Sequence, residues 1–425
     1  MNTQKIVGII AEFNPFHNGH EYLIKQARER FGDDTGIVIV MSGNFVQRGT
    51  PALLSKEIRT ECALLGGADL VIELPIPAAC GSAEYFAGSA ITLLSSMGCV
   101  SDILFGSESG DLEALCSIAR FLATEDPAYQ AALKEGLKNG LSFPKARMQA
   151  IGSACGDPSI DPSLLMLPNN ILAIEYLKAM IRLQAPFEAH TIQRCGQGYH
   201  ADAASFSGEG DLFLSAEQIR LAIAEHLPAY RYAQAMPAYA ATRLDAEVAH
   251  GRILSMEDLS DALLSRLQFC SKEELLAYQD MTEDLAIKIL NKRFSASLLP
   301  DLIGQLKSRD LTYTRISRML LHVLLEITKE EVKQGSFLSY LKVLGFRKSQ
   351  ARILTAIKEC STLPLITQYH EVQSLPATIR DAYEKDAARD GLCALLRAAK
   401  ESRMQDTEVS IRPQHPYTTQ LIILS

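Results

Sequence analysis

The first hundred or so residues alternate short, almost uninterrupted apolar runs with longer amphipathic segments. Helix candidates lie between the runs, at 20–31, 55–67 and 82–98. Strands that are apolar throughout are buried on both faces, and helices that separate them are the crossovers of a parallel sheet. The sequence therefore predicts an α/β fold with a doubly wound, Rossmann-like parallel sheet, whose ligands bind at the carboxyl ends of the strands. The four apolar runs are KIVGIIAEF (5–13), TGIVIVMSG (35–43), DLVIELP (69–75) and VSDILFGSE (100–108).

The chain then changes character. Helix candidates at 111–125 and 167–183 precede a strand candidate at 187–195, and Ser215 with Gln218 has the form of a capping box that opens another helix. Beyond about residue 235 helical periodicity dominates, as in 311–332, and strand-like runs disappear except for an edge strand expected in TTQLIILS. We therefore predict an α/β domain over 1–234 and a mostly α-helical domain over 235–425.

Composition excludes several classes of protein. The 425 residues are 47% hydrophobic and 22% charged, and no apolar stretch is long enough for a membrane helix. The N-terminus has the pattern of a first strand and not of a signal peptide. Nine scattered cysteines without a CxxC pair are typical of reduced thiols, so a cytoplasmic location is expected, with no membrane partner. The net charge is −8, but residues 272–352 carry 14 Lys and Arg against 10 Asp and Glu, which permits a polyanionic partner there.

The segment FNPFHNGH (13–20) follows the first strand and places two histidines three residues apart. As metal ligands, His17 and His20 lack the glutamate of an HExxH helix and a third partner. As phosphate ligands they suit the position better, because Asn18, Gly19 and His20 fall at the start of a helix, where free N–H groups and the helix dipole favour an anion. The alternative is a turn with two hydrogen-bonded histidines.

The combination of a strand, H17-N-G19-H20 and a helix resembles the HxGH signature of the HIGH nucleotidyltransferase superfamily, which breaks ATP or CTP between the α and β phosphates. A second superfamily signature, ISSTxIR, is similar to FLSAEQIR at 213–220, where Ser215 and Arg220 match the residues that hold the leaving phosphates. Glu217 stands at the usual Thr position, and a carboxylate is unfavourable near phosphates unless it points away. An ordinary capped helix is the alternative interpretation of this segment.

Longer stretches resemble a narrower family, the tRNA(Met) cytidine acetate ligases. They are VMSGNFVQRGTPALLSK (40–56), PNNILAIEYLKA (168–179), IQRCGQGYHAD (192–202) and YTRISR (313–318). The resemblance implies a ligase that forms acetyl-adenylate from acetate and ATP and transfers the acetyl group to N4 of cytidine 34 of elongator tRNA(Met). Mg²⁺ is expected with ATP, although the sequence names no metal ligands, and DNA is not expected as a partner. The polar loop with Asn44, Gln47 and Arg48 could hold acetate or the entering base, or could be only a lid.

The resemblance also implies the site residues. His17, His20 and Arg220 are the expected catalytic residues. Gly106 could let adenine or ribose approach the backbone, or could be a plain turn glycine. Asn169 could contact the nucleotide or cap a helix, and Arg194 could contact phosphate or adenine, or form a surface salt bridge. The expected ATP-binding residues are Val7, Gly8, Ile9, Ile10, Ala11, Glu12, Phe13, Asn14, Pro15, Phe16, His17, Asn18, Gly19, His20, Gly106, Asn169, Arg194 and Ser215.

Basic residues of the second domain form the expected tRNA surface. Arg315 and Arg318 lie three residues apart on one predicted helix face, and a solvated face with scattered salt bridges is the alternative. Two other functions compete with the ligase: a small-molecule nucleotidyltransferase that carries an unrelated helical appendage, and a non-catalytic RNA-binding protein. The expected tRNA-binding residues are Lys288, Lys292, Arg293, Lys307, Arg309, Arg315 and Arg318.

Overall fold

A computed structural model describes residues 5–157, 160–194, 213–309, 311–404, 411–415, 417 and 421–425. Its centre is a sheet with the order β10-β8-β5-β2-β1-β6-β7, and β9 pairs with β8. The strands β5, β2, β1, β6 and β7 are parallel, whereas β8 runs antiparallel to β5. The bounds are β1 Ile6–Ala11, β2 Gly36–Ser42, β5 Leu70–Leu74, β6 Asp102–Ser107, β7 Glu188–Gln193, β8 Leu341–Arg347, β9 Leu365–Ile366 and β10 Ile422–Leu424.

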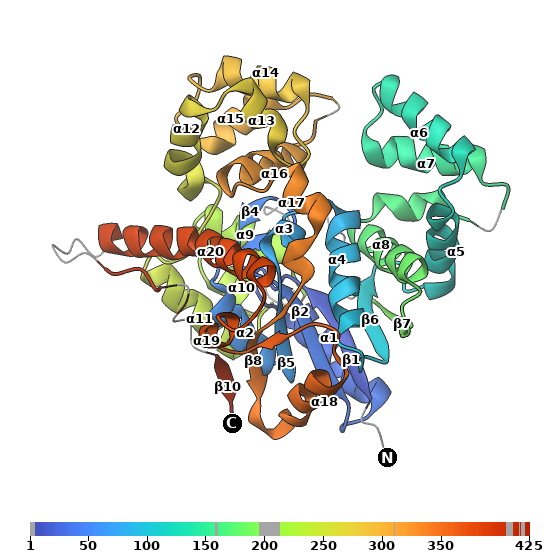
Figure 1. The fold of residues 1–425 in the computed structure, drawn as a ribbon, viewed down its shortest axis with the longest axis vertical. Helices are drawn as coiled ribbons and strands as arrows, with labels where there is room; N and C mark the ends of the chain where they lie inside the picture. Colours follow the sequence, from blue (N-terminus) through green and yellow to red (C-terminus); the bar gives the residue numbers. More distant parts are fainter. Residues whose placement is uncertain are drawn as a thin grey trace.

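Helices cover both faces of this sheet, as a doubly wound fold requires (Figure 1). The core on one face joins the sheet to α4, α5 and α8. The core on the other face joins it to α1, α2, α9 and α11. The predicted parallel sheet with helices on both faces is therefore confirmed. The bounds are α1 Asn18–Phe31, α2 Lys56–Leu65, α4 Ala83–Ser96, α5 Leu112–Ala123, α8 Pro168–Leu183, α9 Ala216–Ala224 and α11 Ala238–Ala249.

The prediction that strands disappear beyond about residue 235 is wrong for β8 and β9. The sequence of β8, LKVLGFR, contains two cations and a glycine, so its apolar run is too interrupted to signal a strand. Its place is set instead by pairing with β5, which lies far away in the sequence. The expected edge strand in TTQLIILS is confirmed as β10, which pairs with β8. Both parts of the chain thus contribute to one sheet.

A group of helices with its own hydrophobic core lies beyond the carboxyl ends of the parallel strands, at the end of the molecule away from the N-terminus (Figure 1). The helix expected over 311–332 is broken there, because α16 ends at Leu324 and Glu326 has a φ of 52°. Helices α6 and α7 stand beside this group, and the guanidinium of Arg309 lies over their connecting turn, where a β-carbon added to Gly140 would be 3.3 Å from Nη1. The bounds are α6 Pro127–Lys138, α7 Phe143–Ala154, α12 Ser260–Phe269, α13 Lys272–Ala277, α14 Glu283–Lys292, α15 Leu299–Leu306, α16 Tyr313–Leu324 and α17 Lys329–Gln334.

The long helix α20, Ala377–Met404, is fixed to the sheet by buried charges. Lys56 at the start of α2 and Lys342 of β8 each lie 2.8 Å from a carboxylate oxygen of Glu73 in β5. Both ammonium groups also pair with Asp390 of α20. We call Lys56, Glu73, Lys342 and Asp390 the buried charge cluster. No helix in the described part of the chain combines the length and apolar character needed to cross a bilayer.

The remaining elements are short or peripheral. A two-stranded hairpin, β3–β4, follows β2 and lies against α16, because a β-carbon on Gly49 would be 2.4 Å from the backbone nitrogen of Arg318. The bounds are β3 Phe45–Val46, β4 Thr50–Pro51, α3 Ile76–Ala79, α10 Tyr230–Ala233, α18 Arg352–Cys360 and α19 Tyr369–Val372.

Candidate active site

The two histidines of HNGH lie just past the carboxyl end of β1 and close the first turn of α1. His17 is the N-cap of α1, and its Nδ1 accepts a hydrogen bond of 3.0 Å from the backbone N–H of Gly19. The Nδ1 of His20 accepts a bond of 3.2 Å from the N–H of His17. The two rings stack with centroids 3.7 Å apart. Two imidazoles in a capping box are thus held face to face.

This bonding fixes the tautomer of both rings. A nitrogen that accepts a hydrogen bond carries no proton, so the proton of each neutral ring lies on Nε2, which is left as a donor. Burial, followed by the charges of Arg194 and Arg220, lowers the pKa of His17 to about 3. Burial, then His17 and Arg194, holds the pKa of His20 well below its usual value. At neutral pH the pair therefore presents two uncharged Nε2–H donors.

The backbone N–H groups at the start of α1 are less available to bind an anion than the sequence predicted. The N–H of Asn18 donates to the carbonyl of Ala235, that of Gly19 donates to the His17 ring, and that of His20 donates to the His17 carbonyl. An anion at this end of β1 would therefore be held by side chains, with the helix dipole in support.

The second signature comes together with the first. Ser215 caps α9 through the predicted capping box with Gln218, which is confirmed. Five residues on, Arg220 donates from Nη1 to the carbonyl of Asn14, three residues before His17 in the chain. Burial lowers the pKa of Arg220. Among the described residues, no carboxylate lies within ion-pair distance of this guanidinium, so its charge is unpaired in the site.

A third group lies at the carboxyl ends of β6 and β7. Arg194 Nη1 donates to Asn169 Oδ1 over 3.3 Å, and a β-carbon on Gly106 would be 3.3 Å from Arg194 Cγ. Asn169 is in turn held by Glu108, whose Oε1 accepts from its backbone N–H at 3.0 Å and from its Nδ2 at 2.7 Å. The N–H of Asn170 binds the other oxygen of Glu108 at 2.7 Å. Glu108 thus caps α8 and orients both Asn169 and Arg194.

These three groups lie close to one another. The charges of Arg194 and Arg220 both lower the pKa of His17, in addition to burial. Arg194 directly follows β7, whereas Arg220 belongs to α9. The structure therefore assembles two imidazole donors, two guanidiniums and a capped helix at the carboxyl edge of a parallel sheet. Such a set suits a polyphosphate, whose charge the guanidiniums offset and whose oxygens the Nε2–H groups can bind.

Comparison with known proteins decides the family. The family model for HIGH Nucleotidyl Transferase matches residues 4–408. A tRNA(Met) cytidine acetate ligase of Caldicellulosiruptor saccharolyticus is 41% identical over 84% of this chain and 85% of its own length, and one of Halothermothrix orenii is 37% identical over 85% and 86%. The chain belongs to the tRNA(Met) cytidine acetate ligase family. The predicted family and enzyme class are confirmed.

Solved structures agree with this assignment. The crystal structure of Thermotoga maritima TmcAL bound with alpha-thio ATP has a TM-score of 0.85 and 28% identity, and the match covers 99% of this chain and 100% of that one. The apo form of the same protein has a TM-score of 0.87 at 30% identity with the same coverage. The whole chain, including the helical group, thus shares the fold of this acetate ligase family.

The other predicted nucleotide-binding residues lie either in the core beneath the site or at the end of β1 and in its connection to α1. The side chains of Val7 and Ile9 are buried in the core beneath the site, and Gly8 faces Leu94, where a β-carbon would be 2.8 Å from a side-chain carbon. Glu12 lies at the strand end, and its Oε1 accepts from the N–H of Gln47 at 2.7 Å. Also in place are Ile10 and Ala11 in β1 and Phe13, Asn14, Pro15 and Phe16 in the connection to α1. Their contact with nucleotide stays a prediction.

The polar loop after β2 is already engaged in the protein. Asn44 accepts from the N–H of Lys56 at 3.0 Å and donates to Asp390 at 3.2 Å, so its side chain organises the loop. Arg48 forms an ion pair of 3.1 Å with Glu217. Glu217, which stands at the usual Thr position of the signature, therefore points toward the guanidinium of Arg48. A carboxylate close to a phosphate site needs such a partner. Of the family stretch 192–202, residues 195–202 lie outside the described part of the chain.

Arg59 was missed by the sequence analysis. This fully buried guanidinium donates to the carbonyls of Leu54, Glu12, Ser42 and Gly43, and so joins the ends of β1 and β2 to the loop. Nothing in its spacing on α2 distinguishes it from a surface cation. Glu108 was also missed, although its place two residues after Gly106, at the predicted ligand edge, was a usable signal.

The predicted tRNA-binding residues are not equivalent. Arg293 donates from Nη1 to the carbonyls of Leu267 and Cys270, so it holds the ends of α12 and α14 together. Arg318 is half-buried beside the β3–β4 hairpin. The exposed members of the set are Lys288, Lys292, Lys307, Arg309 and Arg315.

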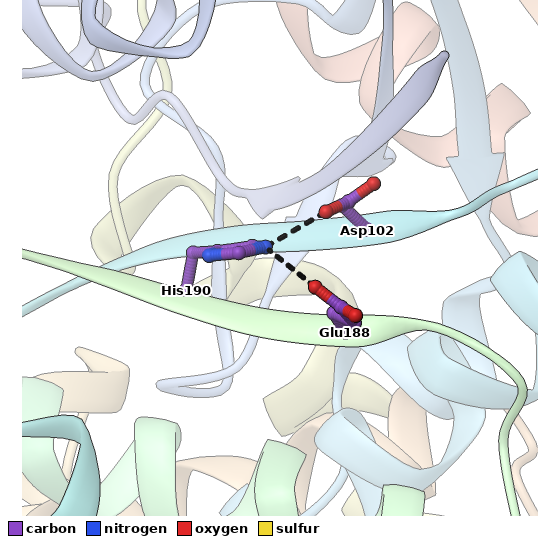
Figure 2. A group of neighbouring side chains, drawn as sticks. All are labelled: Asp102, Glu188 and His190. Carbon is purple, nitrogen blue, oxygen red and sulfur yellow. Dashed lines mark hydrogen bonds and ion pairs between the residues drawn. The ribbon is translucent and has the colours of Figure 1, made fainter. Parts of the chain in front are cut away.

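One group of potential metal ligands lies elsewhere. Asp102, Glu188 and His190 converge at the amino ends of β6 and β7, the edge opposite the active site (Figure 2). His190 Nε2 is 2.7 Å from Asp102 Oδ1, and Lys5 Nζ is 3.1 Å from the same oxygen. Because an ammonium group already neutralises this carboxylate, the cluster fits an ion-paired strand end better than a metal site.

Proposed function

We propose that this chain activates acetate with ATP and transfers the acetyl group to N4 of cytidine 34 in elongator tRNA(Met). The observation that carries the proposal is the meeting of His17 and His20 with Arg194 and Arg220 at the carboxyl edge of the sheet. The choice of acceptor is supported by the relatives named tRNA(Met) cytidine acetate ligase. The choice of nucleotide is supported by the TmcAL crystallised with alpha-thio ATP.

The first step needs positioning and charge stabilisation, not a base. Acetate is ionised at neutral pH, so one of its oxygens attacks the α-phosphorus directly while the bond to the β-phosphate breaks and pyrophosphate leaves. The Nε2–H groups of His17 and His20 would bind oxygens of the reacting phosphate. Arg220 and the N-terminus of α9 would hold the leaving pyrophosphate.

Magnesium enters this proposal with ATP, as part of the substrate complex. The carboxylates around the site are occupied: Glu12 accepts from Gln47, Glu108 caps α8 and Glu217 pairs with Arg48. The ligands of the ion would then be phosphate oxygens and water.

In the second step the N4 amine of cytidine attacks the carbonyl carbon of acetyl-adenylate, AMP leaves, and the nitrogen loses a proton. A mixed anhydride is already activated, so orientation of the base carries most of the task. The proposal keeps the functional division between ATP chemistry in 1–234 and tRNA binding in 235–425. The exposed cations around α14 and α16 suit the tRNA backbone. It also places the enzyme in the cytoplasm, with its tRNA substrate.

A small-molecule nucleotidyltransferase is the competing function, because the phosphate site alone would serve it equally well. The helical group beyond the strand ends separates the two: α12 to α16 have no role in transferring a nucleotide to a small molecule, whereas a tRNA substrate needs such a surface.

ATP–pyrophosphate exchange, measured with and without acetate, tests the proposal. We expect exchange that requires acetate, collapses in His20→Ala, and persists in His250→Ala, whose ring is exposed and bonds the carbonyl of Ala246 in its own helix. Acetylation of tRNA(Met) from labelled acetate then tests the acceptor. Exchange that is independent of acetate but requires another small nucleophile would overturn the ligase function in favour of the competing one.

A further inference from the structure

Two phenylalanines of the helical group project into solvent. Phe269, the last residue of α12, is 87% exposed, and Phe294, just after α14, is 79% exposed. They are the most exposed large apolar side chains among the described residues, followed by Tyr230 at 68%. A single exposed apolar residue needs no explanation, but two on one support do.

The support is a hydrogen-bonded bracket between the ends of α12 and α14. Arg293 Nη1 donates to the carbonyls of Leu267 at 3.0 Å and Cys270 at 3.3 Å, on either side of Phe269. Gln268 Nε2 donates back to the carbonyl of Arg293 at 3.4 Å. The residue before Phe294 is therefore hydrogen-bonded to both neighbours of Phe269, so the two rings stand on one connected support.

The turn after Phe294 is fixed as well. The N–H of Ser295 donates to the Lys292 carbonyl at 2.8 Å, and Gln305 Nε2 donates to the Ser295 carbonyl at 3.1 Å. Beneath the bracket, Leu267 and Ile289 are fully buried. The exposure of the rings is thus a property of a packed structure and not of a loose loop.

Positive charge accompanies the rings. The guanidinium of Arg293 lies 5.3 Å from the ring centroid of Phe294, Lys292 precedes it, and Lys288 is exposed one turn earlier on the same helix. The acidic residues of α14, Glu283 and Asp284, are at its opposite end. Next to Phe294 in the chain, a shallow hollow is lined by the polar residues Ser295, Ser297 and Gln305 and by one carboxylate, that of Asp301.

We propose that Phe269 and Phe294, with Lys292 and Arg293 beside them, form a stacking platform for unpaired bases of the tRNA substrate, distinct from the cytidine that is acetylated. The inference rests on the proposed function and names how part of the helical group takes the RNA. Unpaired RNA bases stack on aromatic rings without regard to their identity, and adjacent cations meet the phosphates. A stable protein interface buries about 800 Å² of surface on each partner and is centred on a continuous apolar core. Two rings set among polar and basic residues do not supply one.

Helices α12 and α14, which carry the platform at their ends, lie beyond the carboxyl ends of the parallel strands (Figure 1), and the active site is at that same edge of the sheet. A tRNA with one nucleotide in the active site can therefore extend over this face. The rings would add affinity and orientation for the tRNA while leaving the adenylation chemistry untouched.

The test compares paired substitutions in the full chain. For Phe269→Ala with Phe294→Ala we expect the Kd for tRNA(Met), measured at one fixed salt concentration, to rise about tenfold or more, while acetate-dependent ATP–pyrophosphate exchange stays unchanged. Phe269→Tyr with Phe294→Tyr keeps the stacking surface and should bind like the wild type. Phe269→Leu with Phe294→Leu keeps apolar area without a flat ring and should bind weakly. Leu395→Ala, at an exposed position of α20, is the control.

Several outcomes would overturn the platform. They are a Kd unchanged in the alanine pair, leucine variants that bind as tightly as the wild type, or a change in sedimentation that reveals lost contact between copies of the chain. Failure of the proposed function is distinct from these, because it would appear in the wild type itself as no tRNA binding or acetylation.

Discussion

The active site and the buried charge cluster both hold cations away from water, and they differ in what accompanies those cations. In the cluster, burial alone would lower the pKa of Lys56, but Asp390 and Glu73 more than offset it and raise that pKa. Lys342 and Lys56 likewise outweigh burial at Glu73 and lower its pKa to about 2. Among the described residues, the guanidinium of Arg220 in the active site bonds a carbonyl and no carboxylate, and burial lowers its pKa.

The difference separates a structural use of charge from a functional one. Paired charges are satisfied in the free protein and join α20 to the sheet, so removing one leaves its partners uncompensated. Unpaired cations and Nε2–H donors are satisfied only when an anion arrives, so removing one costs binding and catalysis. A substitution in the buried charge cluster should therefore lower stability, whereas one in the active site should lower ligand binding and activity.

The largest effect on stability is expected at Lys56. Among the described residues, Lys56→Met leaves Asp390 with Lys342, at 3.6 Å, as its one cationic partner, and should lower the free energy of unfolding by about 3–5 kcal/mol. Urea unfolding measures this. Lys25→Met, which removes an exposed pair with Glu29, should cost under about 1 kcal/mol. A loss at Lys56 as small as that at Lys25 would contradict the structural role of the cluster.

At Arg220 the expected effect is on catalysis. Arg220→Met should lower acetate-dependent ATP–pyrophosphate exchange by roughly 10²- to 10³-fold, as loss of one stabilising donor does, and should leave the urea midpoint unchanged or higher. Arg243→Met, which breaks a surface pair with Glu61, should alter neither. If Arg220→Met unfolded the protein while the remaining folded fraction stayed active, the two regions would not differ as described.

Substitution of Glu108 tests whether a carboxylate supports the active site by orienting other residues. Glu108→Gln places an amide NH₂ against a backbone N–H at the start of α8 and disturbs Asn169. Because a hydrogen bond to a charged group contributes about 1.5–3 kcal/mol, KM for ATP should rise about tenfold. KM for acetate should change little. Glu113→Gln, exposed in the first turn of α5, is the matched control. An equal rise in both KM values would indicate a general structural defect.

A smaller effect is expected from pH. The folded pKa of His17 is about 3 and its unfolded value about 6.5, so the unfolded chain takes up the proton first. Its contribution to stability is complete above pH 6.5 and is lost as pH falls toward 3. His17→Asn keeps a side-chain oxygen for the Gly19 N–H without a titratable ring. Between pH 7.5 and 5.5 the wild type should lose about 1 kcal/mol more than this variant in urea unfolding. Equal losses would mean that His17 is not held neutral.

Local sequence signals predicted the parts of the molecule that depend on neighbours in the chain. The strands of the parallel sheet, the HNGH turn and the capping box at Ser215 are each encoded within a few residues. The contacts that were missed join residues far apart: Asn44 with Asp390, Arg59 with three chain segments, and β8 with β5. No spacing rule reports such pairs, because a lysine on α2 has the same local pattern whether a carboxylate meets it or water does.

The pairing of β5 with β8 also has a consequence for biosynthesis. During translation β5 emerges early, yet the strand that covers its edge begins only at Leu341. At about 5–20 residues per second that edge waits roughly 15–50 s on the ribosome. An uncovered strand edge is a template for pairing with other chains. The nascent enzyme therefore passes through a period in which the edge of an incomplete sheet is uncovered. During this period a chaperone, or slow collapse of the chain around β1 and β2, must shield that edge.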